Sequence, residues 1–143
     1  MKRKYLTFLP LILLTACNKD NKKQYSTWYV NGQEFKSNNV KKDIGKAVSV
    51  IACRDEINRF TLTFYFSSLP TSGVFHVIRG KNAHPDSVNF VFYYNNNFYT
   101  PYHDGSINII NHKKFRAELS PTWYKNYDNP LDTVLISGTF NEP

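Results

Sequence analysis

The chain has 143 residues, of which 41% are hydrophobic and 16% aromatic, and its formal net charge is +7. This length and apolar content suit one domain with a single hydrophobic core. Lysine and arginine residues are dispersed in small clusters rather than concentrated on one element with aromatic residues between them. That distribution is not the one typical of nucleic-acid-binding proteins, so we expect no nucleic-acid partner.

The first sixteen residues have the pattern of an export signal. Three basic residues at positions 2–4 precede an apolar run at positions 5–14. The run is too short for a transmembrane helix, which needs about 20 apolar residues. It ends in Leu14-Thr15-Ala16-Cys17, a motif that resembles the lipobox of bacterial lipoproteins.

The lipobox resemblance implies that the chain is cut before Cys17 and that this cysteine is acylated, with palmitate among the acyl chains. We therefore expect a signal peptide over residues 1–16 and a membrane as the partner of the acyl chains. Two or three chains form a stable anchor because each buried CH₂ contributes about 0.8 kcal/mol. Cleavage removes three basic residues and no acidic one, so the net charge falls from +7 to +4.

Residues 17–25 are expected to form a flexible tether, since residues 18–24 contain no large apolar side chain. A single β domain should then occupy residues 26–143. If Cys17 is acylated, Cys53 has no cysteine left to pair with. It ends a run of small and β-branched residues at positions 47–53, which predicts a buried, inert thiol.

The remaining sequence consists of short apolar or alternating segments separated by turn residues, a pattern typical of an all-β protein. Asn31-Gly32 lies between two apolar segments, as in a two-residue hairpin turn. In residues 59–67 apolar and polar side chains alternate, which predicts a strand with one face on a core. Further strands are expected at 47–53, 74–79, 87–94, 98–102, 105–110, 115–119 and 133–140, with loops at 36–46 and 121–132. We predict an antiparallel β-sandwich or meander barrel of about 8–10 short strands.

Several motifs resemble those of a group of Bacteroidetes β-rich lipoproteins of unknown function. They are Trp28-x-Val30-Asn31-Gly32-x-x-Phe35, Gly73-Val74-Phe75, Gly105-Ser106-Ile107-Asn108-Ile109 and Ser137-Gly138-Thr139-Phe140. The resemblance implies a β domain anchored in the cell envelope, at the outer membrane. It implies no activity, and it leaves open whether the domain lies on the periplasmic or the outer surface.

The best binding candidates are aromatic residues in and after the stretch at positions 90–102. Tyr93, Tyr99 and Tyr102 belong to this stretch, and Trp123 lies in the expected loop at 121–132. Exposed rings there could stack on a glycan, hold a small ligand or bind an envelope protein. Alternatively, the rings stabilise the sheet by cross-strand pairing alone. If the strands alternate regularly, Tyr93 is exposed beside Tyr99.

A hydrolase is the alternative function. Its candidate residues are His84, Asp86, His103, Asp104 and His112, which would have to converge on one cavity as a metal-dependent or carboxylate-dependent site. No serine-nucleophile motif and no phosphate-binding glycine loop is present. We therefore expect a membrane-anchored, non-enzymatic lipoprotein that is a binding or structural module, without catalytic residues, metal or cofactor.

Overall fold

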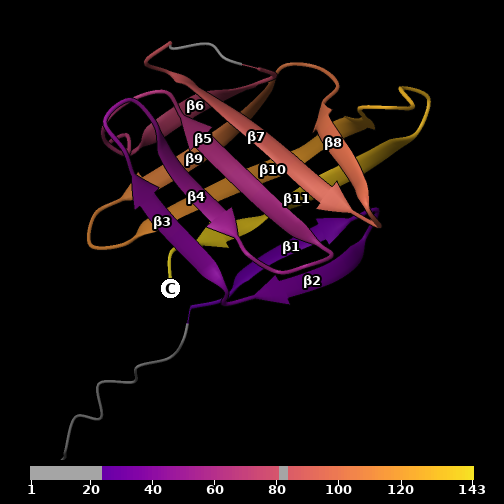
Figure 1. The fold of residues 1–143 in the computed structure, drawn as a ribbon, viewed down its shortest axis with the longest axis horizontal. Helices are drawn as coiled ribbons and strands as arrows, with labels where there is room; N and C mark the ends of the chain where they lie inside the picture. The colour runs from indigo at the N-terminus through magenta and orange to yellow at the C-terminus, as the bar shows by residue number, and fades with distance from the viewer. Residues whose placement is uncertain (1–23, 81–83) are drawn as a thin grey trace, which may run out of the picture.

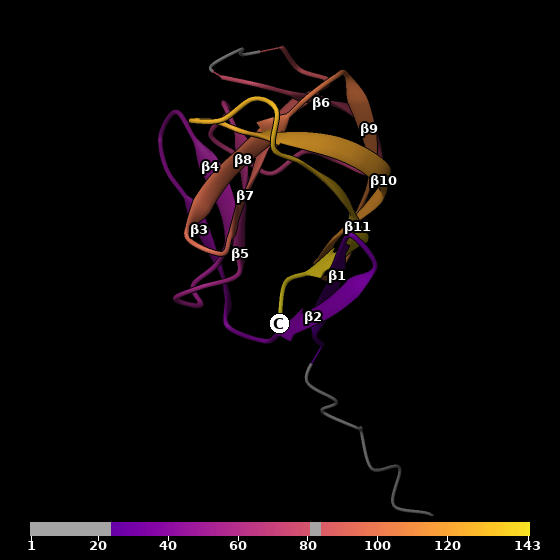
Figure 2. The ribbon, with the colours of Figure 1, turned by 90° about the vertical axis from the view of Figure 1, so that its right-hand side faces the viewer.

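The computed structural model describes residues 24–80 and 84–143. The expected signal peptide, Cys17 and residues 17–23 of the expected tether lie outside the described residues. The described part of the chain consists of strands and connections without a helix, which confirms the all-β fold. Within it there is accordingly no apolar helix of membrane-spanning length. The strands form a sheet that curls over into two facing layers (Figures 1 and 2).

Eleven strands make up the sheet in the described part of the chain. In chain order they are β1 (Ser26–Val30), β2 (Gln33–Ser37), β3 (Val40–Ile44), β4 (Ser49–Cys53), β5 (Arg59–Phe64), β6 (Gly73–Ile78), β7 (Ser87–Tyr94), β8 (Asn97–Pro101), β9 (Gly105–Asn111), β10 (Phe115–Asn126) and β11 (Thr133–Asn141). Neighbouring strands β6 and β7 are parallel, and every other pair of neighbouring strands in the described sheet is antiparallel.

Two tight hairpins have the turn chemistry that the sequence predicts. Between β1 and β2, Asn31 and Gly32 have φ angles of 50° and 84°. Between β7 and β8, Asn95 and Asn96 have φ angles of 48° and 61°. Two consecutive positive φ angles define the type I′ turn, whose twist matches that of the strands on either side. Asparagine and glycine reach these angles at low cost, which explains their presence here.

The sheet includes a small closed barrel, in which the parallel pair of β6 and β7 departs from the antiparallel meander that the sequence predicts. Its strand order is β2-β1-β11-β10-β9-β6-β7-β5-β4-β3, and β8 pairs with both β10 and β7. The strands from β6 to β10 therefore close into a small barrel. The remaining strands extend from it as two arms, β5-β4-β3 from one side and β11-β1-β2 from the other. In Figure 2 these arms face each other, as the layers of a sandwich do.

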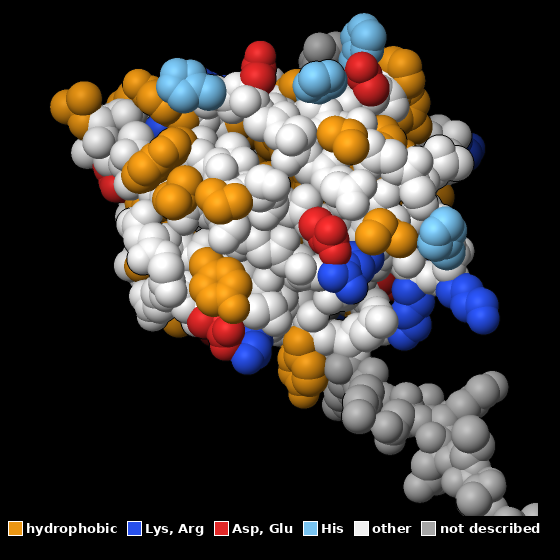
Figure 3. Space-filling view, turned by 180° about the vertical axis from the view of Figure 1, so that it is seen from behind, with side chains coloured by type: hydrophobic (Ala, Val, Ile, Leu, Met, Phe, Trp, Pro, Cys, Tyr) orange, Lys and Arg blue, Asp and Glu red, His pale blue; other side chains and the backbone are white. Residues whose placement is uncertain are grey.

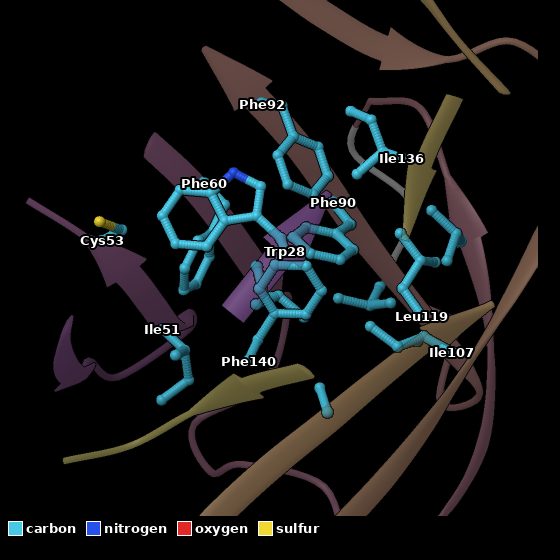
Figure 4. Packing of buried hydrophobic residues seen from close by; sticks show 14 of the residues in the cluster. Trp28, Ile51, Cys53, Phe60, Phe90, Phe92, Ile107, Leu119, Ile136 and Phe140 are labelled. Atoms are coloured by element: carbon cyan, nitrogen blue, oxygen red, sulfur yellow. The ribbon is translucent and has the colours of Figure 1, made fainter. Parts of the chain in front are cut away.

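A cluster of aromatic side chains fills the space between the arms. Phe60 of β5, Phe90 of β7 and Phe140 of β11 are fully buried, and the rings of Phe60 and Phe90 each lie 4.7 Å from that of Phe140. Trp28 of β1 meets Phe60 edge to face at 5.5 Å (Figure 4). Edge-to-face contacts of this kind contribute about 0.5–1.5 kcal/mol beyond burial. Contacts of Phe60 with Trp28 and with Phe140 thus link the two arms.

Two expected loops are partly strands. Residues 36–46 contain β3, which lies at an edge of the sheet. Its two lysines and its aspartate interrupt the apolar alternation by which a strand is predicted, and charged side chains are common on such edges. Residues 121–132 include the end of β10, because this strand continues to Asn126. The register of β10 shifts between Leu119 and Thr122, and an irregularity of this kind tolerates Pro121 within a strand.

Candidate functional site

An open groove forms where β10 changes its neighbour. Leu119 is the last residue of β10 to pair with β9, opposite Ile107, and Tyr124 is the first to pair with β8, opposite Pro101. Between these pairs, β10 faces the link that joins β8 to β9. The groove there has a volume of about 500 Å³. It is lined by His76, His103, Asp104, Gly105, Ser106, Ser120, Pro121, Thr122 and Trp123.

The floor of the groove depends on close packing at Gly105. A Cβ atom at this position would lie 2.9 Å from Cγ2 of Thr122. The Thr122 hydroxyl donates a hydrogen bond to the carbonyl of Ser120 at 2.8 Å, which holds the side chain in place. Gly105 therefore lets the start of β9 pass directly against the irregular part of β10.

Two of the predicted binding residues lie next to each other, Trp123 in the lining of the groove and Tyr102 beside it. Trp123 is 49% exposed and Tyr102 is 44% exposed. The backbone N–H of Tyr102 donates to the carbonyl of Trp123 at 2.9 Å, so the two residues are direct neighbours. A smaller hollow adjoins the groove and is lined by Tyr102, His103, Trp123 and Thr133. We call the two exposed rings of Tyr102 and Trp123 the aromatic platform.

The ring of Tyr102 is positioned by its neighbours. The imidazole of His103 lies edge-on to it, with 4.2 Å between ring centroids. The ammonium group of Lys125 lies 5.0 Å from the centre of the same ring. Both contacts are of the kind that aromatic rings favour, and they limit the orientations open to the phenol. These two contacts orient the Tyr102 ring of the platform.

The other two predicted binding residues lie elsewhere. Tyr99 is 3% exposed, and its hydroxyl donates to Asp132 at 2.7 Å. Burial and the Asp132 carboxylate raise the pKa of Tyr99 to about 12. Tyr93 is half-buried, and its ring lies tilted against that of Phe98, with 5.0 Å between ring centroids. The expected exposed pair of Tyr93 and Tyr99 does not form, because the register places Phe98 opposite Tyr93 and Phe92 opposite Tyr99.

The histidine and carboxylate candidates gather beside the groove, with one exception. A second hollow shares His76 and Asp104 with the groove and is also lined by His84 and Asp86. In Figure 3, histidine and acidic side chains lie along the upper edge of the face shown. His112 follows the far end of β9, about 20 Å from its start at 3.3 Å per residue.

His84 and Asp86 form a pair within this second hollow. Nδ1 of His84 lies 2.8 Å from Oδ1 of Asp86, and both side chains are more than half exposed. The hydrogen bond to His84 lowers the pKa of Asp86. Within residues 24–80 and 84–143, no three histidine, cysteine or carboxylate side chains lie close enough together to hold a metal ion.

His76 is a lining residue that the sequence analysis does not single out. It lies on β6 between the buried side chains of Phe75 and Val77, so alternation directs it away from the core. Its cross-strand partner on β9 is Ser106, which also lines the groove. The alternation of apolar and polar residues in β6 indicates that the His76 side chain points outward, but it does not indicate that β6 pairs with β9.

The groove offers two kinds of contact side by side. Trp123 and Tyr102 supply apolar ring faces, while hydroxyl groups, imidazoles and the Asp104 carboxylate supply hydrogen-bond donors and acceptors. Such a surface suits a ligand that is itself apolar on one face and polar at its edges. Comparison of the chain with protein-family models, with curated proteins and with solved structures finds no match.

Proposed function

We propose that this protein is a non-enzymatic lipoprotein of the cell envelope whose groove binds a glycan. The observation that carries the proposal is the exposed pair of Tyr102 and Trp123 beside a groove lined by polar groups. A sugar ring has an apolar C–H face that can stack on an aromatic ring, and its hydroxyl groups exchange hydrogen bonds with polar side chains. The groove provides both within one surface.

The open shape of the groove favours an extended glycan over a small ligand. Sites for small molecules are usually enclosed and bury most of the ligand surface. Here the groove shares His103 and Trp123 with the hollow at Tyr102. It shares His76 and Asp104 with the hollow at His84 and Asp86. A chain of sugars could contact all three, whereas a small ligand would leave most of this surface empty.

The hydrolase alternative has less support. Glycoside hydrolysis needs one carboxyl group that is protonated at working pH, with its pKa raised by its surroundings. Asp86 is exposed and its pKa is lowered, which makes it a poor general acid. The site therefore supports binding of a sugar better than its cleavage.

Cys17 provides the proposed attachment to the membrane, and the proposed location is the outer membrane. In cells grown with a labelled fatty acid, the protein should carry the label and fractionate with the membrane. A Cys17→Ala variant should lose the label. An unlabelled wild-type protein would contradict the anchor while leaving the groove untested. Protease treatment of intact cells then distinguishes the two faces, because only a domain on the outer surface is digested.

The proposed ligand can be sought with a chain that starts at Asn18, which retains every described residue. We expect this chain to bind one or more glycans on an array of oligosaccharides and polysaccharides. Trp123→Ala should weaken that binding about tenfold to thirtyfold. Tyr25→Ala is a matched control because Tyr25 is equally exposed but lies just before β1. Binding by Trp123→Ala that is as strong as that of wild type, or binding that is weakened equally in both variants, would contradict the proposed site.

A further inference from the structure

The described chain begins at one end of the sheet, where several elements meet. The carbonyl of Tyr25 accepts a hydrogen bond from the side chain of Asn141 at 2.7 Å. The next residue, Glu142, donates its backbone N–H to the carbonyl of Phe115 at 2.9 Å and forms an ion pair with Lys42. These contacts bring the start of β1, the end of β11, the start of β10 and the edge strand β3 together.

This end carries an excess of positive charge, and we call it the basic end. It comprises Lys42, Lys113, Lys114 and Arg116. Lys42 is paired with Glu142, and Arg116 is paired with Glu118. Lys113 and Lys114 are exposed in the turn before Phe115, and among residues 24–80 and 84–143 neither has an ion-pair partner. Figure 3 shows basic side chains at the lower right, away from the histidines along the upper edge.

We infer that the basic end docks on anionic lipid headgroups of the membrane that holds the anchor. The inference rests on the proposed acylation of Cys17. From Cys17 to Tyr25 the chain spans at most about 30 Å when fully extended. The acyl anchor would thus hold the domain near the bilayer by the end that carries Lys113 and Lys114. Each lysine or arginine near an anionic surface adds about a fivefold gain in binding, which is about 1 kcal/mol.

Docking in this way orients the groove. Strand β9 starts at Gly105, in the floor of the groove, and ends at Asn111, beside the turn that carries Lys113. Its seven residues span about 20 Å at 3.3 Å per residue. With the basic end on the lipid, the groove lies at the opposite end of β9 and faces away from the membrane. A glycan in the surrounding layer could then enter it without obstruction by the bilayer.

A vesicle sedimentation experiment tests this inference. The chain starting at Asn18 carries no acyl group, so its binding reports the protein surface alone. It should bind vesicles made of equal parts of phosphatidylcholine and phosphatidylglycerol, but not vesicles of phosphatidylcholine. Lys113→Gln should weaken this binding about fivefold, and Lys113→Gln/Lys114→Gln about 25-fold. Added salt should release the protein, because ions screen exposed charges.

Arg79→Gln is the matched control, since it removes one positive charge beyond the groove end of β6. We expect a change of less than twofold for this variant. Equal weakening by Arg79→Gln and Lys113→Gln would show a response to net charge alone and would overturn the inference. Wild-type affinity in Lys113→Gln/Lys114→Gln would overturn it as well. Because the chain lacks acyl groups, either result leaves the separate fatty-acid labelling test of Cys17 unaffected.

Discussion

Single residues in this fold illustrate how burial controls chemistry. Cys53 lies in the core at 2% exposure, and loss of hydration on burial raises the pKa of its thiol. The thiolate, which is the reactive form, is therefore both scarce and inaccessible. This environment agrees with the sequence-based prediction of a buried thiol, and it sets Cys53 apart from Cys17, which we propose to be acylated.

The burial of Cys53 predicts slow modification in the native protein. With the chain that starts at Asn18, Cys53 is the only thiol, and a disulfide reagent such as DTNB should react with it far more slowly near pH 8 than with the unfolded chain. The two rates can be followed by absorbance without and with denaturant. Equal rates in the two conditions would contradict the position of Cys53 in the core.

Tyr99 predicts a dependence of stability on pH. Its hydroxyl donates to Asp132, and its pKa is raised from an ordinary value near 10 to about 12. The hydrogen bond of the protonated phenol therefore makes its full contribution to the free energy of unfolding below pH 10. This contribution is lost as the pH rises towards 12. Tyr99→Phe should lower the free energy of unfolding by about 1.5–3 kcal/mol near pH 8. Asp132 would still accept a hydrogen bond from Asn126 in this variant.

Urea unfolding of wild type and Tyr99→Phe near pH 8 and near pH 11.5 tests this prediction. The difference between the two proteins should shrink at the higher pH, because the wild type loses its advantage there. A difference that is constant or grows with pH would exclude the hydrogen bond as its source. Comparison with the variant cancels contributions from the other tyrosines, including Tyr124.

At the scale of elements, the pairing of β1 with β11 depends on the lack of a side chain at Gly138, where φ is 156°. This residue is paired with Trp28 across the two strands. A Cβ atom at Gly138 would lie 2.5 Å from the carbonyl oxygen of Thr27 and 2.6 Å from Cα of Trp28. Both are backbone atoms, so a side chain can be accommodated only if the backbone at Gly138 changes its conformation or the strands move apart. The position of Trp28 in the core thus depends on this glycine.

Gly138→Ala should lower the free energy of unfolding by about 1–3 kcal/mol, as overpacking typically does. Gly73→Ala is the control, because a Cβ atom there would meet only a ring carbon of Phe75 at an ordinary 3.6 Å. Thermal unfolding followed by circular dichroism measures both variants. A melting temperature that falls as far in Gly73→Ala as in Gly138→Ala would refute a specific role for the close approach of β1 and β11.

Local signals in the sequence were enough for the hairpins and for the core face of β5. Asn31-Gly32 determines its own turn, and the alternation of Phe60, Leu62 and Phe64 reports burial on one side. Strand β3 and the end of β10 were missed because their patterns depend on partners far away in the chain. The edge position of β3 and the change of neighbour along β10 follow from the whole sheet.

The candidate site was predictable in its residue types but not in its assembly. Tyr102 and Trp123 were chosen as exposed aromatics, yet they become neighbours only because β8 pairs with the end of β10. The same pairing removes Tyr99 from the surface by directing it into the core. Without knowledge of strand order, alternation cannot tell which of the two faces of a strand meets a second layer.

At the scale of the whole molecule, the candidate binding groove and the basic end are separated by the length of strand β9. The groove lies at one end of β9, and the basic end lies at the other. A small domain held by a short tether can then present one end to lipid and the other to a ligand. This arrangement joins the proposed anchor at Cys17 to the proposed glycan site without any large movement of the domain.

The affinity of the groove for a glycan is the most direct test of this account. We expect titration calorimetry with the strongest glycan of the array to show binding by the chain that starts at Asn18. Trp123→Ala should weaken it by about tenfold to thirtyfold, the usual effect of losing an anchoring tryptophan. Tyr25→Ala should change it by less than twofold. If Trp123→Ala binds the glycan as tightly as wild type, the groove is not the binding site.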